Sequence, residues 1–476
     1  MKKVYIALLG LMLVSACTRD FEEINTNDNA PIQVQPEFLL RQVVYDMGEQ
    51  MSYEGFVAGN LLGQYFTAID FNLFDRHSLT EPQYGGNPWP ILYRNLRDNE
   101  TILAQSREVP VYAVYEGPAM IMKAYIGAQI TDIYGDVPFF TAAQGKAGEV
   151  LPAYDAQEDI YTAEGGILDL LEGAVRAIDA YEGTQPLNGD ILFGGDLAAW
   201  RTFANSLRVK YLLRISAAQD VSAALQALVN EGDLMMDNSQ NAAYDFTDGR
   251  PNNFRMANLR AGDFNLYIMS ETMEEITTEL NDPRVGVLFR PSENFPGEYR
   301  GLLNGPDASQ TSISVADYSL TGTIFREETS RLDANFLTAW EVAFCLAEAA
   351  QRNLVTGVDA QAMYEQGVTQ AFAYWGTELP ADYLLVGNAA YGAMDPMEQI
   401  ITQKWLGNCV NGYEGWIEYR RTGFPAFKTI SASLNNDRIP VRMPYPADEQ
   451  ALNRENFEAA TAENGNSINA PVWWNE

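Results

Sequence analysis

The stretch that decides the fold is NFLTAWEVAFCLAEAAQ, residues 335–351. Phe336, Trp340 and Phe344 recur at intervals of four, so their side chains fall on one stripe of a helix. Small alanines lie beside that stripe, and they would let a neighbouring helix approach closely. The spacing therefore predicts a buried amphipathic helix that packs against another helix.

Further stretches carry the same helical period, and long loops separate them. The helical stretches are 111–134, 157–180, 197–217 and 357–375, and the intervening Gly/Asn/Pro/Asp-rich segments are 68–90, 232–264, 286–330 and 376–394. No clean tetratricopeptide repeat of about 34 residues is present. Loops this long in a compact domain are usually functional or locally ordered. We therefore expect one mainly α-helical domain of packed helix pairs, with a loop-rich, irregular face.

The first seventeen residues have the composition of a lipoprotein signal. Lys2 and Lys3 precede an apolar run at 4–14, which is too short for a bilayer that needs about 20 residues. Small residues then precede Cys17, which looks like a bacterial lipobox. We expect residues 1–16 to be removed and Cys17 to be acylated. The alternative is an ordinary signal peptide with an incidental cysteine.

The acylated Cys17 would hold the mature chain on a membrane, because several acyl chains together anchor a protein stably. Residues 17–34 are polar and acidic, which suits a tether, and residues 35–476 are expected to form the single helical domain. No later segment has enough uninterrupted apolar residues to span a bilayer.

The charge balance excludes one class of partner. Acidic residues outnumber basic residues 64 to 31, and the formal net charge is −33 at pH 7. A surface this acidic repels phosphate backbones, so we expect no nucleic-acid partner.

Catalytic and metal-binding motifs are missing. The chain has one histidine, His77, so a zinc site built from several histidines is excluded. A single loop histidine is more often a hydrogen-bonded structural residue than a catalyst. No His-Glu-x-x-His, Gly-x-Ser-x-Gly or Asp-x-Asp-x-Asp-Gly pattern occurs. We expect no enzymatic activity, no cofactor and no metal. Glycoside hydrolysis, which needs only two carboxylates, stays open as an alternative.

Two cysteines follow Cys17. Cys345 lies in the predicted helix 335–351, and Cys409 lies further along, within the C-terminal third of the chain. We expect two free thiols in the core, and a disulfide is the alternative.

Seven short blocks occur in a fixed order. They are DIYGDVP (132–138), WRTFANSLR (200–208), NDPR (281–284), the 340–348 helix, QKW (403–405) leading to GWIEYRRTGFP (415–425), IPVRMPYP (439–446) and VWW (472–474). With the lipobox, this series resembles the SusD/RagB-like outer-membrane lipoproteins, specifically the SusD-like branch. The resemblance runs from Cys17 to Trp474.

The resemblance implies a fold and a role. Tetratricopeptide-like helix pairs would support an irregular ligand-facing half. The protein would be lipid-anchored on the outer face of the outer membrane, where it would bind a nutrient and deliver it to a SusC-like TonB-dependent transporter. Ligands in the family are mostly oligosaccharides, and some members bind peptides. An accessory lipoprotein that binds no nutrient is a further alternative.

We interpret most of the blocks as structural. We expect the first block, 132–138, to end a helix at Gly135. Its aspartates, Asp132 and Asp136, are expected to cap helix ends or to form ion pairs. Arg420 and Arg421 end another helix and are expected to pair with buried acids. The terminal tryptophans, including Trp474, are expected to dock the tail against the body.

The candidate ligand residues lie in two loops. Sugar rings rest their C–H faces on aromatic planes, and their hydroxyls need paired acceptors and forked donors. In the first loop, 71–90, the residues with this chemistry are Phe74, Asp75, Arg76, Tyr84, Asn87 and Trp89. The alternative for Trp89 is a place in the core.

The second candidate is a basic, amide-rich patch at 250–260 in an otherwise acidic protein. Its candidate ligand residues are Asn253, Arg255 and Arg260. The alternative is that these side chains pair the loop with the body of the protein.

Overall fold

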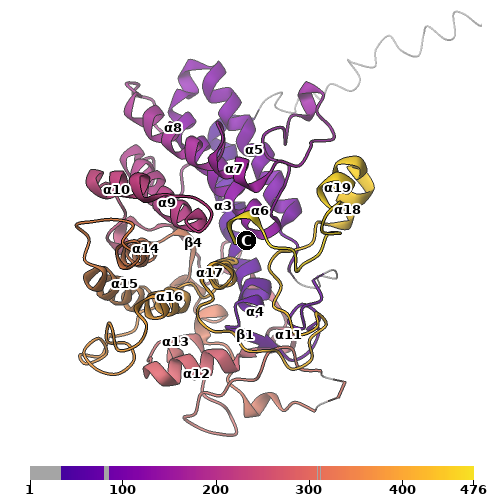
Figure 1. Cartoon of the computed structure of the whole chain (residues 1–476), viewed down its shortest axis with the longest axis vertical. Helices are drawn as coiled ribbons and strands as arrows, with labels where there is room; N and C mark the ends of the chain where they lie inside the picture. The colour runs from indigo at the N-terminus through magenta and orange to yellow at the C-terminus, as the bar shows by residue number, and fades with distance from the viewer. Residues whose placement is uncertain (1–33, 80–84, 308, 311, 476) are drawn as a thin grey trace, which may run out of the picture.

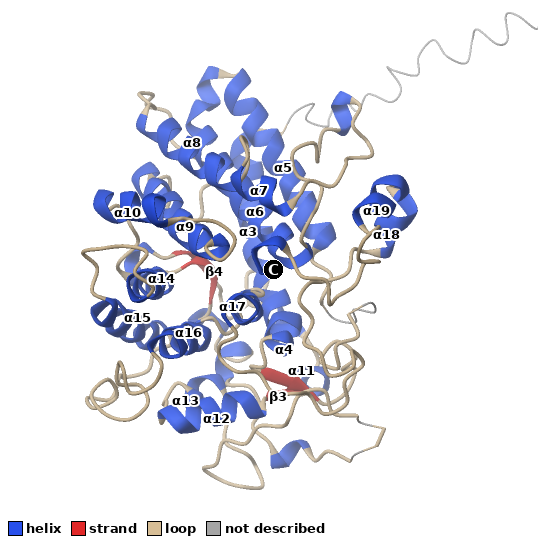
Figure 2. Ribbon diagram, viewed as in Figure 1, coloured by secondary structure: helices blue, strands red, loops and turns tan. Residues whose placement is uncertain are grey.

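The computed structural model describes residues 34–79, 85–307, 309–310 and 312–475. Cys17, most of the predicted tether and Tyr84 lie outside the described residues. The described chain is mainly helical with a few short strands (Figures 1 and 2), which confirms the predicted fold class. None of the helices in this part of the chain is both long enough and apolar enough to cross a membrane.

The regular elements follow one another with long irregular connections. The helices are α3 (Pro36–Glu54), α4 (Asn60–Leu62), α5 (Trp89–Glu108), α6 (Glu116–Tyr134), α7 (Gln157–Thr162), α8 (Ile167–Asp179), α9 (Leu197–Ile215), α10 (Ser222–Glu231), α11 (Ala261–Phe264), α12 (Glu271–Leu280), α13 (Val285–Leu288), α14 (Ala339–Gln351), α15 (Ala360–Tyr374), α16 (Pro396–Gly407), α17 (Glu414–Thr422), α18 (Ala447–Leu452) and α19 (Arg454–Ala460). The strands are β1 (Phe66–Ala68), β2 (Ala242–Asp245), β3 (Tyr267–Met269) and β4 (Asp333–Leu337).

The helices pack in neighbouring pairs. Helix α5 contacts α6, α6 contacts α8, α8 contacts α9, and α14 contacts both α15 and α16. In Figure 1, α5–α8 make up the upper part of the molecule, and α14–α16 lie at its left side. The close contact of α14 with α15 depends on Gly367, because a Cβ there would lie 2.8 Å from the ring of Phe344.

Two antiparallel strand pairs, β1–β3 and β2–β4, join segments that are far apart in the sequence. The second pair corrects the helix predicted over 335–351. Residues 335–337 belong to β4, where Leu337 pairs with Ala242, and α14 begins only at Ala339. The helical period could not show that β2 would bind this end of the stretch.

Two other predicted helices differ at their ends. The stretch 157–180 divides into α7 and α8, because Gly165 has a φ of 76° and breaks the helix between them. In the stretch 111–134 the α-helix begins at Glu116, after a 3₁₀ segment at Pro110–Tyr115. The predictions for 197–217 and 357–375 match α9 and α15 to within three residues.

A buried ion network connects the helical scaffold to the C-terminal segment. Arg214 of α9 forms ion pairs with Asp132 of α6 and Glu414 of α17, and all three side chains are almost fully buried. Lys210 lies 2.9 Å from Glu341 of α14 and 3.0 Å from Glu414. Because each charge has a buried partner, removing one would leave another uncompensated in the interior.

The expected ion pairs of the two adjacent arginines are half correct. Arg421 lies 2.5 Å from Glu348 and 2.7 Å from Glu418, as predicted. Arg420 instead donates to the backbone oxygen of Asp132, and its guanidinium lies over the rings of Trp416 and Trp474. The indole faces take the place of the expected carboxylate.

Other structural predictions are confirmed. Gly135 ends α6 with a φ of 82°, and Trp474 is buried with its indole N–H donating to Asp132 over 2.9 Å. Cys345 and Cys409 are buried free thiols.

Candidate functional site

A pocket of about 410 Å³ lies between the first candidate loop and the C-terminal segment, a size that is usual for small-molecule sites. We call it the loop pocket. Its lining residues are Leu79, Gly86, Asn87, Tyr134, Pro444, Tyr445, Pro446, Ala447, Asp448, Gln450, Phe457 and Asn466. The end of α6 therefore meets residues that follow it by more than 300 positions.

The lining combines aromatic rings with unengaged polar groups. The aromatic residues are Tyr134, Tyr445 and Phe457, which are buried in the wall of the pocket, with 1%, 3% and 8% exposure. Asn87 and Asp448 are exposed, and no hydrogen bond or ion pair engages their side chains within the described part of the chain. Such groups are available to a ligand, because the protein does not already use them.

The backbone beside Asn87 is held in place by a buried acid. The N–H of Gly86 donates to Glu54 Oε2 over 2.7 Å, and Tyr413 Oη donates to the same oxygen over 2.6 Å. Burial raises the pKa of Glu54. Gly86 has a φ of 86°, and a Cβ there would lie 2.3 Å from the ring of Phe74. Only glycine fits this turn without strain.

An aromatic cluster supports the wall behind the pocket. Trp89 is 8% exposed, and its ring lies 4.9 Å from that of Tyr134 and 6.0 Å from that of Tyr445, measured between centroids. Tyr445 Oη donates to the backbone oxygen of Asp136 over 2.6 Å. Trp89 thus packs against the two buried tyrosines in the wall of the pocket.

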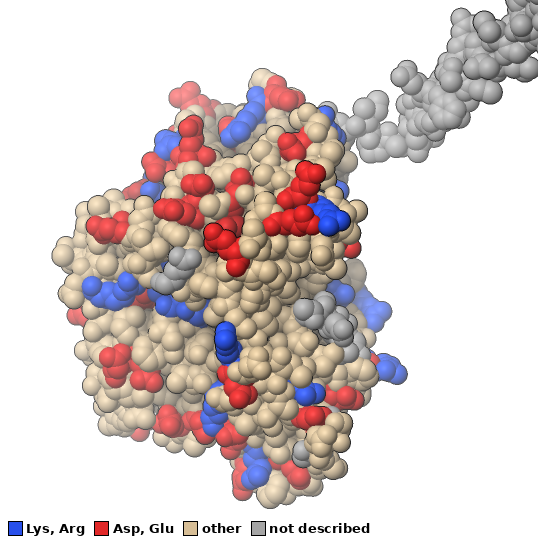
Figure 3. Space-filling view, turned by 45° about the vertical axis from the view of Figure 1, so that its right-hand side comes forward, with Lys and Arg blue, Asp and Glu red and all other residues tan. Residues whose placement is uncertain are grey.

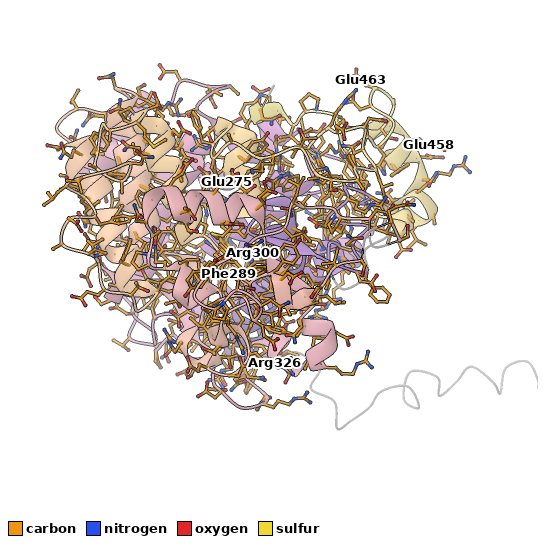
Figure 4. All side chains as sticks on the ribbon, turned by 90° about the horizontal axis from the view of Figure 1, so that it is seen from below. Glu275, Phe289, Arg300, Arg326, Glu458 and Glu463 are labelled. Carbon is orange, nitrogen blue, oxygen red and sulfur yellow. The ribbon has the colours of Figure 1, made fainter. Side chains whose placement is uncertain are left out.

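The α18–α19 hairpin forms the outer rim of the pocket. Tyr154 Oη donates to Glu449 over 2.8 Å, and Asn453 donates to the backbone oxygen of Pro152 over the same distance. In Figure 4, Glu458 and Glu463 mark this part of the chain at one side of the molecule, well away from Glu275 of α12. The rim is therefore a projecting element attached to the body through residues 152–154.

The structure places the first-loop candidates in different environments. Phe74 and Trp89 belong to the hydrophobic core, and Asn87 is exposed at the loop pocket. Arg76 donates to the backbone oxygen of Ala432 over 2.9 Å and lies 3.7 Å from Asp307. Only Asn87 of the described first-loop candidates lines the pocket.

Asp75 is buried and holds the loop to its surroundings. Its carboxylate accepts hydrogen bonds from Thr67 Oγ1, Ala68 N, Asn304 Nδ2 and Gly305 N. Burial raises the pKa of Asp75 to about 6, although the hydrogen bonds partly oppose that shift. This geometry gives Asp75 a positioning role in joining β1 to residues 304–305.

His77 is a buried loop residue, and its Nδ1 lies 3.2 Å from the backbone oxygen of Arg438. Burial lowers the pKa of His77 to about 4, so the ring is neutral at pH 7.

The second-loop candidates lie apart from the loop pocket. Asn253 is buried and exchanges hydrogen bonds with Asn258. The guanidinium of Arg255 lies 4.0 Å from the ring centroid of Tyr53, and the exposed Arg260 lies 2.9 Å from Asp263. Each side chain has a partner within the protein.

Sequence reasoning missed most of the pocket. Tyr134 and Tyr445 lie in blocks that we interpreted as structural, and both are buried in the wall of the hollow. Asp448 carries no motif, and nothing in the sequence shows that α18 returns to the end of α6.

No metal centre is suggested by the described residues, which contain no group of three or more His, Cys, Asp and Glu side chains placed to hold an ion.

A SusD-like family model, described as starch-binding and associating with the outer membrane, matches residues 28–446. The chain belongs to the SusD-like family. That match covers most of the described body and ends just before α18, and it confirms the family resemblance.

Solved structures agree with this assignment. A SusD homologue from Bacteroides fragilis has 24% identity, a TM-score of 0.78, and coverage of 93% of this chain and 100% of its own. A chitin-binding protein has 25% identity, a TM-score of 0.78, and coverage of 92% and 99%. A chitin-binding SusD homologue from Flavobacterium johnsoniae has 22% identity, a TM-score of 0.77, and coverage of 92% and 98%. The comparison with curated proteins found no match.

Proposed function

We propose that this SusD-like protein is a non-catalytic binding protein that captures a neutral oligosaccharide in the loop pocket. The observation that carries the proposal is the lining itself, in which the exposed, unengaged amide of Asn87 and carboxylate of Asp448 lie at a hollow backed by the buried residues Tyr134 and Tyr445. The amide and carboxylate can accept from or donate to the hydroxyls of a sugar. The family description and the two chitin-binding relatives support a glycan ligand.

The charge of the pocket favours a neutral glycan over an acidic glycan or a peptide. Among the described residues, the lining includes Asp448 and no lysine or arginine, so they offer a ligand carboxylate no cationic partner. The face in Figure 3 shows a broad uncharged area with mainly acidic side chains above it and both basic and acidic side chains below it. A neutral chain of sugars would approach this surface without repulsion.

The same lining supports a binding role without hydrolysis. Hydrolysis of a glycosidic bond uses two carboxylates on either side of the bond. Asp448 is the single carboxylate among the described residues that line the pocket. The described lining can therefore hold a glycan without offering a second acid or base.

We extend the proposal to the place of action. Residues 1–16 would be removed, acylated Cys17 would anchor the chain in the outer membrane, and residues 17–34 would tether the domain of residues 35–476 outside the cell. The bound glycan would pass to a SusC-like TonB-dependent transporter. Support comes from the lipobox and from the outer-membrane association of the family.

Calorimetry of the mature chain with starch-derived and chitin-derived hexasaccharides tests the ligand class. We expect binding to at least one of them, weakened tenfold or more by the double substitution Asn87→Ala/Asp448→Asn. Glu458→Gln, on the outer side of the same rim, is the matched control and should bind like the native chain. Binding of peptides alone, or sustained release of reducing ends, would overturn the proposal.

Labelling with a fatty acid tests the location. Cys17→Ser should abolish incorporation of label, and the native chain should co-purify with a TonB-dependent barrel from outer membranes. A mature chain found without acyl groups in the periplasm would contradict the proposed anchoring.

A further inference from the structure

A second pocket lies on another side of α3. It has a volume of about 490 Å³, and its lining includes Arg41, Gln42, Tyr45, Tyr244, Asp245 and Asn252. We call it the α3 pocket. It shares no lining residue with the loop pocket.

The α3 pocket has a fixed aromatic surface. The rings of Tyr45 and Tyr244 are stacked, with centroids 5.8 Å apart and planes at 22°. Tyr244 Oη donates to the backbone oxygen of Tyr45 over 2.9 Å, and Tyr45 Oη donates to the backbone oxygen of Pro251 over 3.3 Å. Gly48 makes room for this arrangement, because a Cβ there would lie 2.4 Å from Tyr244 Cε1. The half-buried Tyr45 is thus held with its ring at the pocket.

The polar groups around that ring are unengaged. The side chains of Arg41, Gln42 and Asn252 are exposed, and none makes a hydrogen bond or ion pair with another described residue. Arg41 is notable because the protein carries an excess of acids with which it could pair. These groups supply a forked donor and two amides beside an aromatic plane.

Asp245 completes the set with an acceptor. It stands opposite Asp333 in the β2–β4 register, and the two carboxyl groups are hydrogen-bonded. Asp245 therefore keeps a defined orientation at the pocket. The lining contains one cation and one acid, so it offers donors and acceptors without a dominant charge.

The two pockets are separate along α3. Glu54, which holds the wall of the loop pocket, follows Tyr45 by nine residues, or about two and a half turns. The two side chains therefore leave α3 on opposite sides. One short glycan would not fill both pockets, so occupancy of the α3 pocket would be an independent binding event.

We propose that the α3 pocket is a second, independent binding site for a neutral glycan, with Tyr45 as the stacking surface and Arg41, Asp245 and Asn252 as hydroxyl partners. This inference rests on the proposed function, because it assigns the same ligand class to a second place. A second site would raise the local concentration of glycan near the loop pocket.

Calorimetry with the same two hexasaccharides on the full mature chain in detergent tests the proposal. The native chain should bind two molecules per chain. Asn87→Ala/Asp448→Asn should remove one binding event, and Tyr45→Ala should weaken the other tenfold or more. Arg41→Gln and Asn252→Ala repeat the test at side chains without protein partners, so their effects would not come from misfolding. Arg107→Gln, an exposed arginine elsewhere, is the control.

The outcomes separate this inference from the proposed function. A single binding event that is lost in Asn87→Ala/Asp448→Asn and unchanged in Tyr45→Ala, Arg41→Gln and Asn252→Ala would overturn the second site alone. Absence of binding to either hexasaccharide in every form of the protein would overturn both. Binding of only a uronic-acid oligosaccharide or a peptide at the α3 pocket would overturn the neutral-glycan class.

Discussion

Trp89 presents its ring edge-on to Tyr134, with centroids 4.9 Å apart and ring planes at 89°. Trp89 is 8% exposed and Tyr134 is 1% exposed, so both rings belong to the buried wall of the loop pocket. Of the two roles that the sequence left open for Trp89, a sugar platform or a place in the core, the structure shows the core, where Trp89 supports another ring. A substitution of Trp89 would therefore change the shape of the pocket wall, although Trp89 itself is not among the residues that line the pocket.

Replacement of Trp89 by alanine should lower both stability and glycan affinity. We expect a loss of about 3–5 kcal/mol in the free energy of unfolding, because a large buried ring leaves a cavity. Trp89→Phe should lose less of both. Chemical denaturation and calorimetry measure the two effects. Asn87→Ala is the comparison, since it should weaken binding without a loss of stability; an unchanged stability in Trp89→Ala would contradict the supporting role.

The turn at Gly86 should be intolerant of a side chain. Gly86→Ala places a methyl group 2.3 Å from the ring of Phe74 at a φ of 86°, so we expect a loss of about 1–3 kcal/mol and weaker glycan binding. Gly249→Ala is the matched loop control, because a Cβ there meets nothing within 4 Å and the φ is not positive. Equal stability of the two variants would show that the turn is not rigid.

The helical scaffold could be predicted because its signal is local. Trp200, Phe203 and Leu207 follow the helical period, and all three are fully buried in α9. The period fails where a distant strand competes, as at Asn335, which joins β4. Such pairing depends on β2, nearly a hundred residues earlier, and leaves no mark in the local pattern.

The loop pocket could be predicted only in part, because its two sides come from distant segments. Asn87 lies in a loop whose aromatic and polar composition predicts ligand binding. Asp448 lies in the first turn of α18, and no sequence motif marks it. Phe74 and Asp75 share the same loop composition, yet the fold buries both. Composition identifies which loop is rich in ligand-binding chemistry, and it does not show which side chains point outward.

The facing carboxyls of Asp245 and Asp333 predict a pH dependence. Burial and the nearby Asp245 raise the pKa of Asp333 from 3.8 to about 7, so between these pH values the folded chain holds a proton that the unfolded chain releases. The stabilising contribution is complete below about pH 4 and is lost as the pH rises through 7. Asp333→Asn removes the titrating group and so avoids this loss, and the variant should gain about 1–2 kcal/mol over the native chain as the pH rises from 4 to 7. Denaturation at several pH values measures it, and parallel curves for the two proteins would refute it.

The ion pair of Arg214 with Asp132 should control the geometry of the pocket from within. Asp132 lies two residues before Tyr134 in α6, and it also accepts hydrogen bonds from Tyr161 and Trp474. Arg214→Met leaves Asp132 without its buried ion-pair partner, although Glu414 keeps Lys210, so we expect a loss of about 3–5 kcal/mol in the free energy of unfolding.

Arg176→Met is the control for that substitution, because Arg176 pairs with Glu172 on the surface of α8 and should cost less than about 1 kcal/mol. Since Arg214 fixes the end of α6, its loss should also weaken glycan binding at the loop pocket while leaving the α3 pocket unchanged. Denaturation and calorimetry on both variants separate these effects. Equal stability of the Arg214 and Arg176 variants would mean that the buried network adds nothing beyond a surface pair, and Tyr134 would then be held by Trp89 and its ring contacts alone.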